Sequence, residues 1–181
     1  MKPDLTDVYA QLGVVKDSLG CIMLKVEPLK VDDIITQDDV YNTGDPNKYW
    51  LNGIVSQDFA HCTLLWGLME SGQAWKTYVD KALEGWSLDS VTVDELSFFE
   101  SNHEDEKYYC LVAKLAVSPE LLDANARLRN LPHIDNFPEY LPHVTIAYIK
   151  DDPKLRDDIL YALNNRFLGK KLATQGLDYG K

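Results

Sequence analysis

The sequence predicts one α+β domain with a mixed sheet, and three observations lead to this prediction. The 181 residues, 45% of them hydrophobic and 26% charged, suit a single globular domain with a sizeable core. Strand-like apolar runs interleave with helical periodicities along the chain. Two segments, His61–Trp66 and His143–Tyr148, repeat one pattern of residues. They stand far enough apart to lie in two halves of one domain.

The first third of the chain combines one clear strand with irregular sequence. Residues 1–18 hold a weak apolar periodicity, which predicts a short helix before Gly13. Residues 20–26 form an apolar run without strict alternation, and this predicts a strand buried on both faces. Residues 27–60 are rich in turn formers, so we expect a long loop or lid there.

The middle of the chain predicts one helix and one hairpin. After the first His-Thr segment, apolar residues recur at helical spacing from Trp75 to Trp86 and predict an amphipathic helix. Residues 91–98 alternate but slip by one position near Asp94, which predicts a strand with a bulge. An acidic turn then leads into residues 108–117, so these two strands form a predicted hairpin.

The last third contains two predicted helices, one on either side of the second His-Thr segment. Ser118 and Asp152 are capping residues that each precede a proline, which is typical of a helix start. Gly169 predicts the end of the second helix. Residues 172–179 predict a last short strand.

Charge, cysteines and hydropathy limit the kind of partner. The formal net charge is −11, so we expect no long nucleic acid, because nucleic-acid binders present a basic face to the phosphates. A small nucleotide is still compatible, since a few local cations can outweigh the global field. No apolar run approaches the ~20 residues that cross a bilayer, so we expect no membrane partner. The cysteines each lie in an apolar run, which suits reduced core thiols, and they are Cys21, Cys62 and Cys110.

The two repeated segments each place a histidine and a threonine on one face of a strand. Because alternate side chains of a strand share a face, His61 and Thr63 point to the same side. We expect the same of His143 and Thr145 in the second segment. The other side chains point to the opposite, core side, and these are Cys62, Leu64, Trp66, Val144, Ile146 and Tyr148.

This pairing suits phosphodiester chemistry better than the alternatives. Two histidines can act as general base and general acid near pH 7, and threonine hydroxyls can hold the phosphate oxygens. A metal site would need further ligands at a short offset from a motif, and none follows either segment. Cys62 points away from His61, which disfavours a thiol nucleophile. We therefore predict no metal and no cofactor, with acid and base not assigned between the two histidines.

The motifs also carry a family resemblance. His61-Cys62-Thr63-Leu64 and His143-Val144-Thr145-Ile146 resemble the paired signatures of the two-histidine phosphoesterase superfamily, which includes LigT-like RNA cyclic phosphodiesterases. The resemblance covers about residues 60–180. It implies two pseudo-symmetric lobes of mixed or antiparallel sheet, with helices outside and an active-site groove between the lobes. It also implies metal-independent catalysis by the four motif residues His61, Thr63, His143 and Thr145.

Within that superfamily the chain is similar to bacteriophage anti-CBASS nucleases, which degrade cyclic oligonucleotide signals. The segments HCTLLWG and LPHVTIAYI carry this likeness. It implies a small 3′,5′-linked cyclic di- or oligonucleotide as substrate. Because the sequence shows no membrane-spanning run and no signal-peptide pattern, we expect a cytoplasmic location, which is the host cytoplasm if a phage encodes the chain. Two alternatives stay open, a 2′,3′-cyclic phosphodiesterase on RNA ends and a non-catalytic cyclic-nucleotide binder. The sequence also leaves open whether the chain forms a homo-oligomer.

Residues outside the motifs are candidates for holding the substrate. Aromatic stacking contributes roughly 1–3 kcal/mol per base, and a lysine adds local positive charge. The candidates are Tyr41, Lys48, Tyr49, Trp50 and Tyr179. Two other histidines are not expected to be catalytic. His103 lies in an acidic turn, and His133 follows Leu-Pro but lacks the threonine of the motif.

Overall fold

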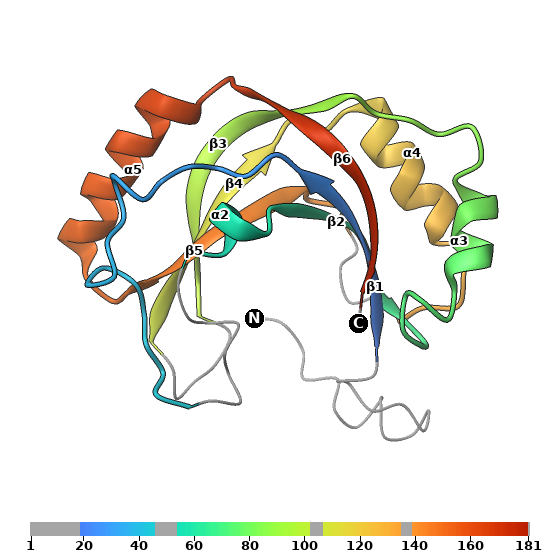
Figure 1. Cartoon of the computed structure of the whole chain (residues 1–181), viewed down its shortest axis with the longest axis horizontal. Coiled ribbons are helices and arrows are strands. Elements are labelled where there is room, and N and C mark those ends of the chain that lie inside the picture. Colours follow the sequence, from blue (N-terminus) through green and yellow to red (C-terminus); the bar gives the residue numbers. More distant parts are fainter. Residues whose placement is uncertain (1–18, 46–53, 102–106, 135–138, 181) are drawn as a thin grey trace.

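The computed structural model describes residues 19–45, 54–101, 107–134 and 139–180 (Figure 1). Its strands are β1 (Gly20–Val26), β2 (His61–Leu68), β3 (Ser90–Glu100), β4 (Tyr108–Leu115), β5 (His143–Lys150) and β6 (Lys171–Gly180). Its helices are α2 (Val55–Asp58), α3 (Lys76–Ala82), α4 (Pro119–Leu128) and α5 (Pro153–Phe167). This order matches the predicted one, except that α2 lies in a segment predicted as loop. The helix predicted in residues 1–18 falls outside the described residues.

The described strands form a closed ring made of two halves. The ring order is β1-β2-β5-β4-β3-β6, and each pair of neighbours is antiparallel. Pairing is extensive within the halves β6-β1-β2 and β5-β4-β3. Where the halves meet it is short, since β2 meets β5 at Cys62–Val144 and β3 meets β6 over Ser90–Thr92. The two predicted lobes are therefore confirmed, and the sheet is antiparallel throughout these strands rather than mixed.

Irregular register gives the strands their curvature. The bulge predicted near Asp94 is confirmed, because the β3–β4 register shifts between Val93 and Glu95. Matching shifts occur between β1 and β2, at Ile22/Met23, and between β4 and β5, at Leu111/Val112. An extra residue on one strand bends it and increases its twist. The second and third shifts therefore bend both histidine-bearing strands in the same manner.

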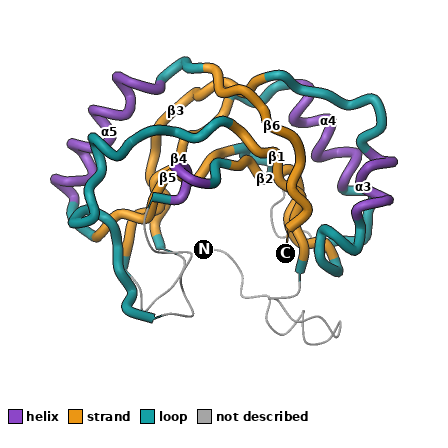
Figure 2. Tube along the Cα trace, viewed as in Figure 1, coloured by secondary structure: helices purple, strands orange, loops and turns teal. Residues whose placement is uncertain are grey.

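Helices cover the outer side of each half (Figures 1 and 2). α5 packs against β3, whereas α4 packs against β2 and beside α3. Both predicted helix starts are confirmed. The Ser118 hydroxyl accepts a hydrogen bond from the Leu121 N–H, and the Asp152 carboxylate accepts one from the Lys154 N–H. None of the helices in the described part of the chain is long and apolar enough to span a membrane.

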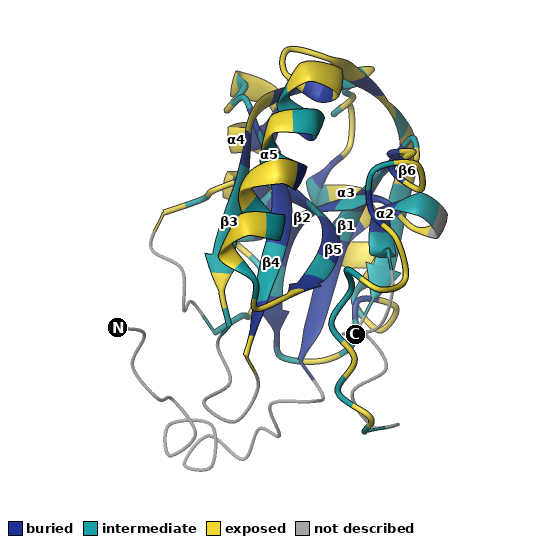
Figure 3. Cartoon of the chain, turned by 90° about the vertical axis from the view of Figure 1, so that its left-hand side faces the viewer, coloured by how far each residue is buried: buried dark blue, intermediate teal, exposed yellow. Residues whose placement is uncertain are grey.

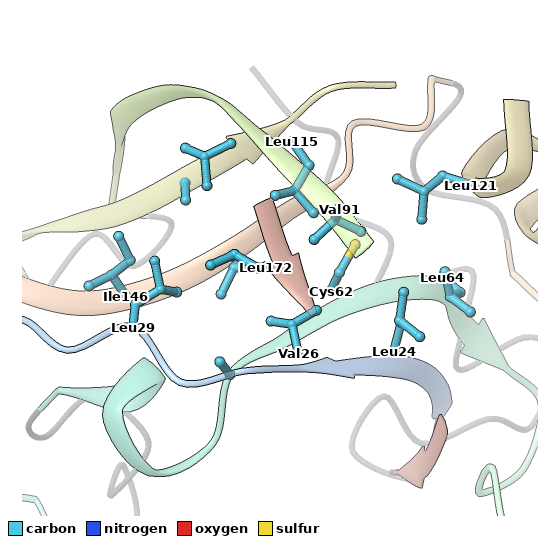
Figure 4. Close-up of a cluster of buried hydrophobic side chains, with 14 of the residues drawn as sticks. Leu24, Val26, Leu29, Cys62, Leu64, Val91, Leu115, Leu121, Ile146 and Leu172 are labelled. Atoms are coloured by element: carbon cyan, nitrogen blue, oxygen red, sulfur yellow. The ribbon is translucent and has the colours of Figure 1, made fainter. Parts of the chain in front are cut away.

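The core gathers side chains from all six described strands and from these helices, and buried residues concentrate on the strands (Figure 3). Figure 4 shows how β1, β2 and α4 contribute Leu24, Leu64 and Leu121 to one cluster. Cys62 is fully buried in the same cluster, as predicted, and burial raises the pKa of its thiol to about 11. Tyr78 departs from the predicted apolar stripe of α3, because it is 58% exposed.

The described parts of the segment 27–60 are anchored to the body. Leu29 is fully buried, and its N–H donates to the Ser56 carbonyl at 3.1 Å. Val40 forms an isolated β-bridge with Ile149, which holds this part of the segment beside β5. Residues 46–53 fall outside the described residues, and the lid stays a prediction.

Candidate active site

The four motif residues surround Cys62 and Val144, the one residue pair by which β2 and β5 connect the two halves. Cys62 pairs with Val144 in antiparallel register, which brings His61 toward Thr145 and Thr63 toward His143. His61 and His143 occupy diagonal positions of this pairing, and residues so placed lie about 7–8 Å apart. The two imidazoles are close enough to interact, because the positive charge of His143 lowers the pKa of His61. The structure thus brings the two predicted pairs together as one cluster.

The histidine face of the sheet points away from the covering helices. The strand residues whose side chains point to the other face contact the helices. The Arg156 guanidinium of α5 lies 5.0 Å from the Tyr109 ring centre. The Tyr179 hydroxyl forms a hydrogen bond with Asp80 of α3. Tyr109 and Tyr179 pair with core residues of their neighbouring strands, Ile149 and Ile22. The four motif residues are half-buried, so they lie on the face that is open to a ligand.

The backbone orients the imidazole of His143. Its Nδ1 lies 2.9 Å from the carbonyl oxygen of Leu141. Because a carbonyl only accepts, this contact assigns the proton of the neutral ring to Nδ1. Nε2 is then the nitrogen left for a substrate. Phe99 contacts the same ring edge-on, with centroids 5.3 Å apart.

His61 sits in a drier environment. Burial is the main cause that lowers the pKa of His61 below its ordinary value of 6.5. The Asp178 carboxylate and the backbone of Phe59 act in the opposite direction. The Phe59 interaction is weaker than the Leu141 contact of His143, because the buried Nδ1 of His61 has no partner of normal hydrogen-bond geometry among the described residues. The neutral ring of His61 is therefore favoured.

Both histidine strands carry an aromatic residue on the open face, which simple alternation assigned to the core. Thr63 and Leu65 pair with consecutive residues of β1, so Leu64 is an extra residue. Leu64 and Leu65 are both buried, and Trp66 returns to the face of Thr63. The prediction that Trp66 points to the core is wrong for this reason.

The second strand repeats this arrangement. Thr145 and Ala147 pair with consecutive residues of β4, so Ile146 is the extra residue. Tyr148 therefore shares the face of Thr145, and its predicted core position is also wrong. The sequence held a signal for both corrections: two consecutive apolar residues follow each threonine, where a regular strand would alternate.

Sequence analysis did not identify two lysines and two acidic residues that lie on the open face. Lys25 lies opposite His61 in the register of β1 and β2, and Lys114 lies opposite His143 in the register of β4 and β5. Residues directly opposite in an antiparallel pair share a face. Asp178 acts on His61, and Glu95 lies 3.6 Å from Lys114. The signal was a lone cation inside each of two apolar strands.

The predicted substrate-binding residues are placed differently from one another. Tyr41 lies beside the site, because its N–H donates to the Tyr148 carbonyl at 2.8 Å and its ring lies 5.4 Å from that of Tyr108. Tyr179 points to α3 on the opposite face. The remaining three predicted residues, Lys48, Tyr49 and Trp50, fall outside the described residues.

Other polar side chains have structural contacts. Nδ1 of His133 lies 2.7 Å from the Leu131 carbonyl, and His133 bridges Leu68 at the far end of β2. His103 falls outside the described residues. Cys110 has its pKa raised to about 11 by burial, and a hydrogen bond with Thr145 works against this rise. Within residues 19–45, 54–101, 107–134 and 139–180, no three His, Cys, Asp or Glu side chains gather as a metal site.

The fold is shared with a solved structure. The chain is similar to Usb1 from Kluyveromyces marxianus, with a TM-score of 0.55 over 91% of this chain and 95% of that chain. Their sequences are 10% identical, so this likeness concerns the fold. No protein-family model matches the sequence, and no curated protein matches it.

Proposed function

We propose that this protein is a phosphodiesterase that uses His61 and His143 as its acid–base pair. The observation that carries the proposal is the clustering of both His-Thr pairs around Cys62–Val144 on the open face of the sheet. Usb1, which has the same fold, belongs to the two-histidine phosphoesterase superfamily. The motifs of this chain resemble the signatures of that superfamily.

The environments of the two histidines favour different roles. His61 has a lowered pKa, so it is the better general base: it is neutral when the reaction begins and can take the proton of the hydroxyl or water that attacks the phosphorus. His143 then protonates the leaving oxygen, with Nδ1 held by the Leu141 carbonyl. Thr63 and Thr145 donate hydrogen bonds to the non-bridging oxygens. This division of roles requires no metal ion.

The substrate class that we propose is a 3′,5′-linked cyclic di- or oligonucleotide. Its bases can stack on the aromatic residues that reach the open face, and these are Tyr41, Trp66 and Tyr148. The net charge of −11 disfavours a long nucleic acid but permits a small nucleotide.

A second candidate is cleavage at RNA ends that carry a 2′,3′-cyclic phosphate. The fold shared with Usb1 favours it. The chemistry at the histidines would be the same, and only the groups around the scissile phosphate would differ.

The test is chromatography of products from a cyclic dinucleotide, a cyclic trinucleotide and a short RNA with a 2′,3′-cyclic end. Each substrate is incubated with the protein in the presence of EDTA, beside the His61→Ala/His143→Ala variant. Cleavage by the parent protein but not by the double variant supports the proposal. The preferred substrate distinguishes the cyclic-oligonucleotide activity from the activity on RNA ends. Recovery of all three intact, or equal cleavage by the double variant, would contradict it.

A further inference from the structure

We propose that Lys25 and Lys114 bind the phosphates that flank the scissile one, so that the site selects substrates with a phosphate on each side of it. This inference rests on the proposed function and names the substrate class more closely. It starts from a repeated juxtaposition. Each histidine has a lysine as its direct partner on the next strand outward, in register with it.

The order of the strands sets these four residues across the sheet. β1, β2, β5 and β4 are consecutive in the ring, so the two lysines flank the two histidines. Neighbouring strands lie about 4.8 Å apart. A phosphate held between the histidines therefore has one lysine on either side of it, on the strand beyond each histidine, where the neighbouring phosphates of a cyclic oligonucleotide would lie.

Neither lysine has the usual reason for a charge in a strand. Lysines often protect the exposed edge of a sheet from pairing with another chain. β1 lies between β2 and β6, and β4 lies between β5 and β3, so both strands are interior. The surrounding segments are apolar, GCIMLKV and YYCLVAKL.

The position of Lys114 beside His143 is fixed by Phe99. The ammonium lies 5.7 Å from the centre of the Phe99 ring, and the same ring meets His143 edge-on. Glu95 pairs with Lys114 at 3.6 Å, with both side chains well exposed, at 60% and 40%. Exposed pairs of this kind are weak, so a phosphate can replace the carboxylate. Lys25 is half-buried and forms no ion pair with the residues that the structure describes.

Three substrates test this inference, and they contain one, two and three phosphates: bis(p-nitrophenyl) phosphate, a 3′,5′-cyclic dinucleotide and a 3′,5′-cyclic trinucleotide. The variants are Lys25→Gln and Lys114→Gln. The matched control is Lys154→Gln, which removes one positive charge from the exposed start of α5. Each variant is measured for KM and kcat, and for binding of a phosphorothioate cyclic trinucleotide as a function of salt.

Each lysine variant is expected to raise KM for the cyclic trinucleotide about 10-fold or more, as for the loss of a hydrogen bond to a charged group. The salt dependence of its binding is expected to fall by about one in log–log slope. Turnover of bis(p-nitrophenyl) phosphate should change by much less than the KM for the trinucleotide, and thermal unfolding midpoints matching that of the parent chain show that the variants are folded. Lys154→Gln should match the parent chain throughout.

Two outcomes separate this inference from the proposed function. If the histidines are required but the lysine variants lower all three activities equally, the flanking-phosphate role is overturned and the catalytic proposal stands. If no substrate is cleaved, yet trinucleotide binding weakens in both lysine variants and not in Lys154→Gln, the lysine role stands and the catalytic proposal fails.

Discussion

The half that carries His61 and the half that carries His143 have matching strands, bulges and lysines, but they surround the imidazole differently. His61 is held in a drier position, with Asp178 nearby and Nδ1 without a regular hydrogen bond. His143 has Nδ1 bound to the Leu141 carbonyl. The comparison teaches that one backbone frame, used twice, can place two histidines in different surroundings. Two-step acid–base chemistry needs this difference.

The largest expected effect comes from removing either histidine. His61→Ala and His143→Ala should each lower kcat/KM by roughly 10²–10⁴-fold, the usual contribution of a positioned acid or base. If the halves differ as proposed, the residual activity of His61→Ala loses the decline at low pH, and that of His143→Ala loses the decline at high pH. Measured pH–rate profiles with the opposite assignment would reverse the roles of the two halves.

The bulges of the two halves are expected to be equally important for stability. Leu64 and Ile146 are the extra residues, and both are fully buried. Leu64→Ala and Ile146→Ala should each reduce the free energy of unfolding by about 2–5 kcal/mol, because each leaves a cavity in a packed core. Urea unfolding measures this. Leu168→Ala is the matched control, because Leu168 is 58% exposed and should change stability by no more than about 0.5 kcal/mol.

Tyr140 breaks the symmetry between the halves, and its removal should have a smaller effect. Its hydroxyl donates to the Thr63 carbonyl at 2.9 Å and lies 3.7 Å from the Cys62 sulfur. Burial raises the pKa of this hydroxyl, so it stays protonated as a donor. Tyr140→Phe should cost about 0.5–1.5 kcal/mol in unfolding free energy, the net value of one hydrogen bond. An unchanged urea midpoint would mean that this hydrogen bond between the segment before β5 and β2 does not stabilise the fold.

The smallest expected effect is on the pH dependence of folding stability. Because burial lowers the pKa of folded His61 below 6.5, the unfolded chain binds more protons than the folded chain between these two values. Stability should therefore fall as pH drops below 6.5 toward the folded pKa. Thermal unfolding of the parent chain and of His61→Gln should be measured at several pH values below 6.5. The melting temperature of the parent chain should fall more steeply with pH than that of the variant. Parallel curves would indicate that His61 titrates normally.

Local sequence was enough for the elements whose signals lie close together along the chain. The strand predicted at 20–26 has the same bounds in the structure. The Ser118 and Asp152 caps form as predicted, because a capping side chain acts on N–H groups two or three residues away. The bulge near Asp94 was readable from a slip in alternation. Among the candidate site residues, the clustering of His61, Thr63, His143 and Thr145 could be expected because the pattern occurs twice.

The site around those residues could not be predicted in the same way. Trp66 and Tyr148 were placed on the wrong face, because each bulge arises from pairing with a strand that is distant in sequence. Tyr179 was counted as a ligand contact although β6 turns its ring toward α3. Lys25 and Lys114 had no motif at all. Their meaning appears only when strand order and register set each one opposite a histidine.

The sequence by itself therefore determined the class of elements, their order and the duplicated His-Thr pairs, since these depend on periodicity and on residues near one another. Only the tertiary structure decided that β2 and β5 meet at Cys62–Val144 and which face each aromatic residue takes. The physical reason is that a one-residue change of register moves every later side chain to the other face. That register is set by packing between strands that are far apart in the chain.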